Sequence, residues 1–232
     1  MGRSLLGLLP QFAALQLVAA VVAPGSRELG VDPAPGAPRA SADLAVALKG
    51  AQLAIDFSSA EASGTNLRAC VSARVPLLLG TTGLPERLQA ELEQAAMRIP
   101  LLVAANTSLA VTVLMDLVQR AARALPGSFD IQISEAHHRH KRDAPSGTAL
   151  ALGAAAEAAG IRPAGAIGYA VTRGGDLVGE HTVHFIGAGE RLTLSHVASD
   201  RAVFARGALQ AGLWLAGQPP GRYRMQDLIA EK

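Results

Sequence analysis

Short, largely apolar runs alternate with longer segments of helical periodicity between residues 53 and 125. Such runs are typical of strands that are buried on both faces, and these strands occur in parallel sheets covered by helices. Strands are predicted at 53–57, 75–79 and 101–105, and helices at 85–97, at 109–125 and from a Ser58 or Ser59 cap through Arg74. This βαβ progression predicts an α/β unit with a parallel sheet.

The pattern changes after residue 125. A strand is predicted over 129–135, where apolar and polar residues alternate, and a helix over 149–159 that ends at Gly160. Further strands are predicted at 167–172, 180–186 and 191–197, joined by tight turns at 174–176 and 187–189, and Asp200 is expected to cap a last helix to Leu215. We therefore expect a first domain of residues 1–107 completed by 203–232. Residues 108–202 are expected to form a smaller α+β domain with a mixed four-stranded sheet.

Composition excludes several functional classes. The chain is 50% hydrophobic and 17% charged, which is ordinary for a globular protein with a sizeable core. Its single cysteine, Cys70, excludes an internal disulfide and gives no sign of an oxidising compartment. A net charge of +2 is too small to indicate polyanion binding.

A basic loop between the strand at 129–135 and the helix at 149–159 carries most of the functional information. Residues 137–142 are six consecutive histidines, lysines and arginines, and residues 146–148 are Ser-Gly-Thr at the expected start of the helix. Free N–H groups and small hydroxyls at a helix N-terminus bind carboxylates or phosphates. A histidine and a lysine beside such a site can protonate a bound anion. The loop therefore predicts general acid chemistry on an anionic substrate.

Other interpretations of this loop have less support. His137, His138 and His140 would be possible metal ligands, but neighbours on an extended chain point to opposite sides and the loop is strongly positive. A nucleic-acid surface is disfavoured because aromatic residues make up only 3% of the chain. A solvated surface loop is the ordinary explanation for a run of charges, but the adjoining helix start argues against it. A hydrolase with Ser146 as nucleophile lacks a nucleophile elbow.

Residues 135–149, which read Glu-Ala-His-His-Arg-His-Lys-Arg-Asp-Ala-Pro-Ser-Gly-Thr-Ala, resemble the signature of the 4-hydroxy-tetrahydrodipicolinate reductases. These enzymes are also called dihydrodipicolinate reductases and belong to the diaminopimelate and lysine pathway. Residues 80–83, 104–108, 178–182 and 189–192 also resemble family segments, in family order. The resemblance implies a Rossmann-like nucleotide-binding domain at 1–107 with 203–232, and a substrate-binding and oligomerisation domain at 108–202.

The resemblance also implies residue roles. His137 would act as proton donor or acceptor and Lys141 as a proton donor. His138, Gly147 and Thr148 would bind the substrate, with Ser146 in the same anion site. Glu135 and Asp143 are expected to orient the basic loop, because a carboxylate facing a dicarboxylate would repel it. The residues expected to contact NADH or NADPH are Gly80, Thr81, Thr82, Ala104, Ala105, Asn106 and Thr107.

The implied enzyme is a cytoplasmic homotetramer that assembles through the sheet of the second domain. Its substrate is a small dicarboxylate, a cyclic imine that receives a hydride while a cationic group supplies the proton. No metal, nucleic acid or membrane is expected to take part. The lone Trp214 and the histidines His181, His184 and His196 are expected to be structural.

The N-terminal segment has two interpretations. Residues 4–26 are uncharged and rich in Leu, Val and Ala, as in a signal peptide or a short membrane span. Pro10, Gln11 and Gln16 interrupt this run, and no clean cleavage site follows it. The alternative is a buried helix at 3–14 followed by a buried parallel strand at 15–22. The family resemblance favours this alternative.

The sequence departs from the family pattern at its start. Family members begin with a strand and a glycine turn that holds the cofactor pyrophosphate, whereas Met1-Gly2-Arg3 matches only the end of that motif. Val22-Ala23-Pro24 occupies the place where an acidic residue or an arginine selects NAD or NADP, so cofactor choice stays open. Two functional classes follow: the reductase itself, or a non-catalytic relative that retains substrate binding or oligomerisation.

Overall fold

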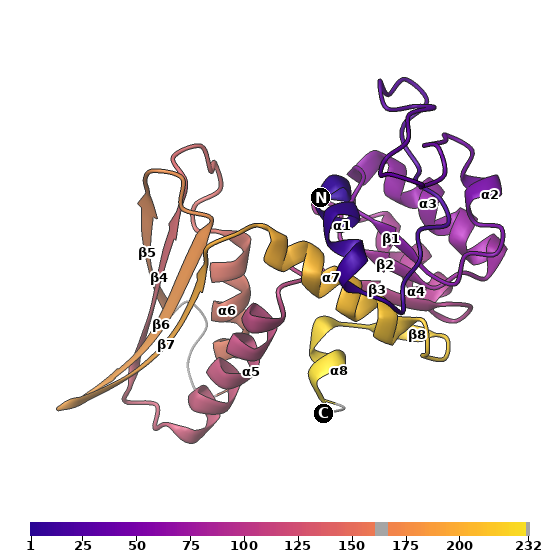
Figure 1. Cartoon of the computed structure of the whole chain (residues 1–232). Helices are drawn as coiled ribbons and strands as arrows, with labels where there is room; N and C mark the ends of the chain where they lie inside the picture. Colours follow the sequence, from indigo (N-terminus) through magenta and orange to yellow (C-terminus); the bar gives the residue numbers. More distant parts are fainter. Residues whose placement is uncertain (161–166, 231–232) are drawn as a thin grey trace. The chain divides into compact units, whose positions relative to one another are not determined.

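The computed structural model describes residues 1–160 and 167–230, and its contacts divide the chain into two compact units. Unit 1 comprises Met1–Ser108 and Phe204–Lys232, and unit 2 comprises Leu109–Val203 (Figure 1). Unit 1 contains a parallel sheet with helices, and unit 2 contains a mixed sheet with two helices. The predicted α/β fold class is confirmed.

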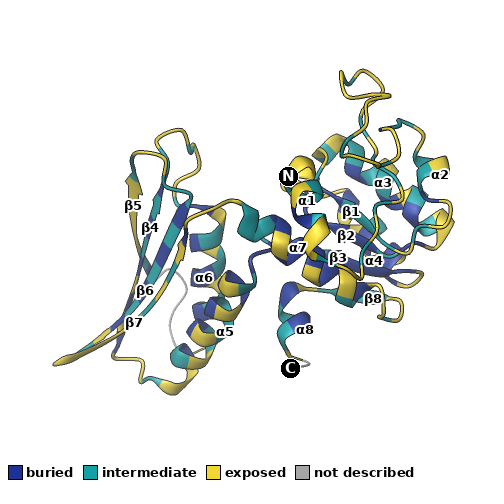
Figure 2. Ribbon diagram, viewed as in Figure 1, coloured by how far each residue is buried: buried dark blue, intermediate teal, exposed yellow. Residues whose placement is uncertain are grey.

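The sheet of unit 1 has four parallel strands in the order β1-β2-β3-β8. Their bounds are Ala54–Asp56 (β1), Leu77–Leu79 (β2), Pro100–Val103 (β3) and Gly221–Tyr223 (β8). The three leucines of β2 are fully buried, because helices cover the sheet on both faces (Figure 2). This burial explains why the central strands appear in the sequence as unbroken apolar runs.

The helices of unit 1 are α1 (Gly2–Leu8), α2 (Leu44–Ala47), α3 (Ala60–Ala73), α4 (Leu88–Ala96), α8 (Met225–Ala230) and the part of α7 (Ala202–Leu215) from Phe204 onward. Ser59 caps α3, since its hydroxyl accepts a hydrogen bond from Ala62 N, and the helix ends at Arg74 in a left-handed conformation. Leu67 of α3 and Leu92 of α4 pack into one core with Leu77 and Leu79. On α7, Gly212 lies against Leu53 and Ile55.

The N-terminal prediction is largely wrong. The helix expected over 3–14 is divided into α1 and a 3-10 turn, Leu9–Gln11. No strand forms over 15–22: Val21 makes only an isolated bridge with Ser41, and the side chains of Val18 and Val21 are 49% and 45% exposed. An apolar run becomes a buried strand only where neighbouring strands supply hydrogen bonds, and this run has none beside it. Among the described residues, no helix combines the length and apolarity needed to cross a bilayer.

The sheet of unit 2 has the order β5-β4-β6-β7. Its strands are β4 (Asp130–His137), β5 (Ile167–Arg173), β6 (Gly179–Gly187) and β7 (Glu190–Ala198). The β4–β5 pair is parallel and the other pairs are antiparallel, as expected for a mixed sheet. Two helices, α5 (Leu109–Ala124) and α6 (Gly147–Glu157), share the buried apolar core of one sheet face, which includes Ile131, Ile133 and Phe185.

One of the two predicted tight turns is a hairpin and the other is not. Gly187 pairs with Glu190, so Ala188 and Gly189 form the turn between β6 and β7, with Gly189 at φ +83. By contrast, β5 pairs with β4 and not with β6. The connection at 174–178 therefore crosses the end of β4, where Gly174 N donates to His137 O at 3.0 Å and His138 N donates to Leu177 O at 2.7 Å. Both connections contain two glycines, which favour a turn, but the order of the strands in the sheet is not local information.

Helix α6 offers a matched test of the unit 2 core. Leu152 is fully buried, whereas Leu150 on the same helix is 50% exposed. We expect Leu152→Ala to lower the free energy of unfolding by about 2–5 kcal/mol because it leaves a cavity. Leu150→Ala should change it by less than about 1 kcal/mol. Urea unfolding followed by circular dichroism measures both, and similar losses in the two variants would contradict the placement of α6.

Candidate active site at the end of strand β4

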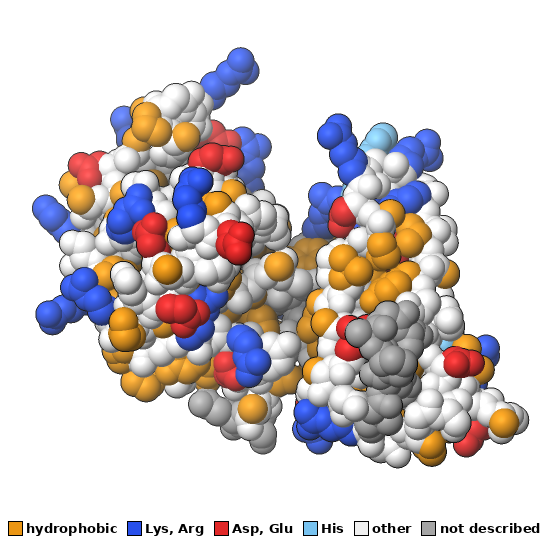
Figure 3. Space-filling model, turned by 180° about the vertical axis from the view of Figure 1, so that it is seen from behind, with side chains coloured by type: hydrophobic (Ala, Val, Ile, Leu, Met, Phe, Trp, Pro, Cys, Tyr) orange, Lys and Arg blue, Asp and Glu red, His pale blue; other side chains and the backbone are white. Residues whose placement is uncertain are grey.

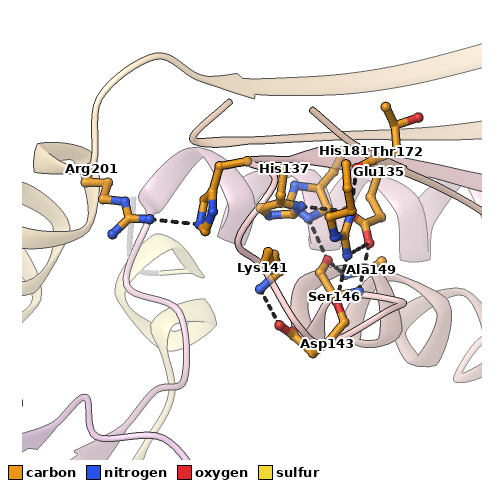
Figure 4. A network of polar contacts seen from close by, with 11 residues as sticks. Glu135, His137, Lys141, Asp143, Ser146, Ala149, Thr172, His181 and Arg201 are labelled. Atoms are coloured by element: carbon orange, nitrogen blue, oxygen red, sulfur yellow. Dashed lines mark hydrogen bonds and ion pairs between the residues drawn. The ribbon is translucent and has the colours of Figure 1, made fainter. Parts of the chain in front are cut away.

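The end of β4 and the start of α6 enclose the basic loop at 138–146 in unit 2 (Figure 4). Glu135 and His137 are two residues apart on β4, so their side chains lie on the same face of the sheet. Ser146 is the cap of α6 and Gly147 its first residue. The structure thus brings together His137, Lys141 and the helix N-terminus that the sequence marked. Lys, Arg and His side chains gather at this end of unit 2 (Figure 3).

Glu135 is the buried centre of the site. Its carboxylate accepts two hydrogen bonds from Arg173, at 2.7 and 2.8 Å, and one from Ser146 N at 3.1 Å. Its Oε2 also lies 2.5 Å from Nδ1 of His137. Burial alone would raise the pKa of Glu135, but the hydrogen bonds from Arg173, His137 and Ser146 outweigh it and lower that pKa. The carboxylate is therefore ionised.

His137 is held from two sides. Its ring meets the ring of His181 edge to face, with centroids 5.1 Å apart. Its Nε2 lies beside Gly179, where an added Cβ would approach it to 3.0 Å, so a larger residue there would crowd the ring. The side chain of His137 is 10% exposed, which leaves a narrow opening to solvent.

Lys141 is paired with a carboxylate of its own loop. Its Nζ lies 2.9 Å from Asp143 Oδ1. The hydrogen bond from Lys141 lowers the pKa of Asp143. The ammonium group that the sequence marked as a proton donor thus already has an anionic partner in the chain.

Ser146 lies inside the site and not on its surface. Its hydroxyl accepts a hydrogen bond from Ala149 N at 3.1 Å and contacts His181 Nε2 at 3.0 Å, and the residue is 1% exposed. The hydroxyl and the backbone N–H of Ser146 are thus both hydrogen-bonded within the protein, since the N–H donates to Glu135. Gly147 and Thr148 follow it in the first turn of α6.

His138 faces a cleft of about 860 Å³ that is lined by His138, Arg139, His140, Gly175, Asp176 and Arg201. Arg201 NH2 lies 2.9 Å from His138 Nε2. A guanidinium only donates, so Nε2 of His138 is the acceptor and the proton of the neutral ring is on Nδ1. Desolvation lowers the pKa of His138, and the positive charge of Arg201 adds to this effect. His138 therefore presents a neutral donor to the cleft.

Arg173 and Arg201 take part in this site, although the sequence interpretation did not single them out. Neither lies in the basic loop: Arg173 ends β5, and Arg201 follows Asp200, whose side chain accepts from Ala202 N. Within residues 1–160 and 167–230, no group of three or more His, Cys, Asp or Glu side chains is placed to hold a metal ion.

Unit 1 carries the residues predicted to contact a dinucleotide, on the loops after β2 and β3. Thr81 is 8% exposed and its hydroxyl has no hydrogen-bond partner in the described part of the chain. Gly80 leaves no room for a side chain because a Cβ would approach Phe57 to 2.2 Å. Thr82 and Ala105 are exposed, Asn106 is half-buried and Ala104 is buried. Thr107 is used structurally, since its buried hydroxyl donates to Phe204 O at 2.6 Å.

Comparisons with known proteins agree over both units. The family models "Dihydrodipicolinate reductase, N-terminus" and "Dihydrodipicolinate reductase, C-terminus" match residues 1–107 and 110–229. Relatives named 4-hydroxy-tetrahydrodipicolinate reductase include one from Anaeromyxobacter dehalogenans (strain 2CP-1 / ATCC BAA-258), 43% identical over 252 residues, and one from Xanthomonas campestris pv. campestris (strain B100), 48% identical over 229 residues. Each alignment covers 99% of this chain and 93% of the relative.

Solved structures share the fold. A dipicolinate-bound dihydrodipicolinate reductase from Paenisporosarcina sp. TG-14 superposes with a TM-score of 0.80 at 20% identity, covering 96% of this chain and 92% of that one. An amine dehydrogenase from Mycobacterium smegmatis superposes with a TM-score of 0.62 at 14% identity, covering 97% and 92%. At these identities the likeness concerns architecture alone.

The buried His181 predicts a loss of stability in acid. Burial, with the nearby His137, lowers the pKa of His181 from 6.5 to about 4. The unfolded chain therefore takes up this proton first as the pH falls, so the contribution of His181 is complete above pH 6.5 and is lost towards pH 4. We expect a loss on the order of 3 kcal/mol, measured by urea unfolding at pH 7 and pH 4.5.

His181→Gln should remove most of this pH dependence. The control His184→Gln, at a half-buried residue on the opposite face of β6, should keep it. Equal pH dependence in the wild type and His181→Gln would contradict the burial of a neutral His181.

Proposed function

This chain belongs to the dihydrodipicolinate reductase family, and from that premise we propose that it reduces 4-hydroxy-tetrahydrodipicolinate to tetrahydrodipicolinate in the diaminopimelate and lysine pathway, with NADH or NADPH as reductant. The observation that carries the proposal is the identity of 43–48% to reductases across nearly the full chain. The cluster at the end of β4 supports it, because its charges suit a small dicarboxylate.

Substrate recognition is assigned to unit 2. Lys141, the neutral donor His138 and the first turn of α6 at Gly147 and Thr148 together offer donors for carboxylate groups. Asp143 now occupies part of this site through Lys141. We infer that a substrate carboxylate replaces Asp143 on Lys141, since the two anions would compete for the same ammonium group.

The proton comes from the same cluster. When bound, the dinucleotide supplies the hydride. The 4-hydroxyl of the substrate must leave as water, which gives the conjugated imine that accepts the hydride. The electron density that the hydride brings must then be balanced by a proton at carbon, and we assign its delivery to His137 and Lys141. His137 is fixed by Glu135, whereas Lys141 is freed when Asp143 leaves it, so both can face a bound substrate.

Cofactor binding is assigned to the loops that follow β2 and β3 in unit 1. Ligands of open parallel sheets bind at the carboxyl ends of the strands, where Gly80, Thr81 and Thr82 lie. The unpaired hydroxyl of the buried Thr81 supports a polar ligand there, because a buried hydroxyl without a partner is costly. The loop after β3 provides further polar groups, namely the backbone of Ala104, Ala105 and Asn106 and the side-chain amide of Asn106. Thr107 contributes by holding α7.

Assembly is assigned to the sheet of unit 2. The face of this sheet opposite α5 and α6 carries Ile186 and Val197, which are 38% and 62% exposed. Exposed apolar side chains on an otherwise polar sheet face support burial against another copy of the chain. We propose a homotetramer formed through this face.

Turnover tests the assignment directly. With freshly made substrate, the wild-type chain should oxidise NADH or NADPH at a rate followed at 340 nm. His137→Gln and Lys141→Ala should each lower kcat about 100-fold or more, because each removes a proton donor. His184→Gln, outside the site, serves as the control and should keep full activity. A folded wild type with no turnover would favour the non-catalytic relative, and unchanged kcat in both site variants would refute the residue roles.

Thr81→Val separates binding from folding in unit 1. Valine has nearly the same shape as threonine but no hydroxyl, so the ligand-free chain should be equally stable or slightly more stable. Loss of the hydrogen bond to the cofactor should raise the KM for the dinucleotide about 10-fold. Thermal unfolding and initial rates measure the two effects. An unchanged KM would show that this hydroxyl does not contact the dinucleotide.

A further inference from the structure

We propose that Glu135 and Arg173 are positioning residues that fix which nitrogen of His137 reacts. The proposal rests on the proposed function for its catalytic consequence, but its structural part concerns His137 alone. Neither Glu135 nor Arg173 touches the substrate in this assignment. They act through the imidazole.

The first step is the contact between Glu135 and His137. Both side chains project from the same face of β4, and Oε2 of Glu135 lies 2.5 Å from Nδ1 of His137 (Figure 4). An ionised carboxylate only accepts hydrogen bonds, so Nδ1 must carry a proton. Nε2 is then the nitrogen that gains or loses the transferable proton. Nε2 is on the side of the ring away from Glu135 and lies beside Gly179.

The second step is the charge on Glu135. The carboxylate has no exposed surface, and an unpaired buried carboxylate would take up a proton to avoid the cost of desolvation. Arg173 prevents this through its two hydrogen bonds to both carboxylate oxygens. The register of the sheet puts Arg173 directly opposite His137, so the pair forms across the parallel β4–β5 ladder.

The third step is that Arg173 also fixes the loop. Its NH2 group donates to Asp143 O at 2.6 Å, and its NH1 group donates to Thr172 O at 2.7 Å. The Arg173 guanidinium therefore links Glu135, which contacts His137, to the loop that carries Lys141. Both proposed proton donors are thus positioned through Arg173.

Nitrogen-15 NMR of histidine-labelled protein tests this without relying on activity. The chain has six histidines, and His137→Gln identifies the signal of His137 by its disappearance. We expect the neutral ring to be protonated on Nδ1. Glu135→Gln should weaken this preference, because an amide can donate to Nδ1 as well as accept from it. Arg173→Gln should weaken it too, since the buried Glu135 without its cation takes up a proton and no longer acts only as an acceptor.

Steady-state rates give the catalytic counterpart. The kcat should fall in each variant as the fraction of His137 protonated on Nδ1 falls, and the KM for the substrate should change less than about threefold. Glu135→Asp keeps the acceptor and should restore part of both effects. If Arg173→Gln does not fold, the double variant Glu135→Gln/Arg173→Gln leaves no unpaired buried charge and should show the same weakened tautomer preference as Glu135→Gln.

Three results would overturn the proposal: a neutral wild-type ring protonated on Nε2, an unchanged tautomer in both single variants, or a loss of activity expressed only in KM. An inactive wild type whose His137 still shows the expected tautomer, with the preference weakened in both variants, would refute the proposed function and leave the positioning intact. His184→Gln is the control for both readouts and should leave them unchanged.

Discussion

A carboxylate cannot be buried without donors, and the site in unit 2 is organised around this requirement at Glu135. Its oxygens receive hydrogen bonds from β5, from the start of α6 and from the neighbouring histidine on β4. Three elements that are distant in sequence thus converge on one side chain. The loop with Lys141 is tied to the same point through Arg173. Removal of that one charge would leave these donors without an acceptor.

The two units divide the chemistry according to their sheets. A parallel sheet aligns the ends of its strands at one edge, so the loops after β2 and β3 in unit 1 suit an extended dinucleotide. A mixed sheet places side chains from parallel and antiparallel neighbours around one strand end. His137 on β4 therefore meets Arg173 from β5 and His181 from β6. The parallel sheet of unit 1 thus supplies backbone and hydroxyl contacts, and the mixed sheet of unit 2 supplies ionisable groups.

The sequence predicted elements whose hydrogen bonds are local or whose burial is complete. The Ser59 cap, the leucines of β2 and the helix after Ser146 are of this kind. It failed where structure depends on distant partners: residues 15–22 lack a neighbouring strand, and 174–176 resembles a hairpin turn although β4 lies between β5 and β6. The same limit applies to the site. The motif marks His137 and Lys141. Arg173 and Arg201, which contact Glu135 and His138, come from β5 and from the residue before α7, so no local pattern marks them. Ser146 is hydrogen-bonded inside the protein.

In the ligand-free site, Lys141 is paired with a carboxylate of the same chain, that of Asp143. A tethered anion is present at a high effective concentration beside its cation, so a free monocarboxylate from solution gains little by replacing it. A diacid can also bind a second group, such as His138 or the N-terminus of α6. This second contact compensates for the displacement of Asp143 from Lys141. Under the proposed substrate assignment, the Lys141–Asp143 pair would favour a diacid over the simple monocarboxylic acids of the cell before any contact with the substrate ring.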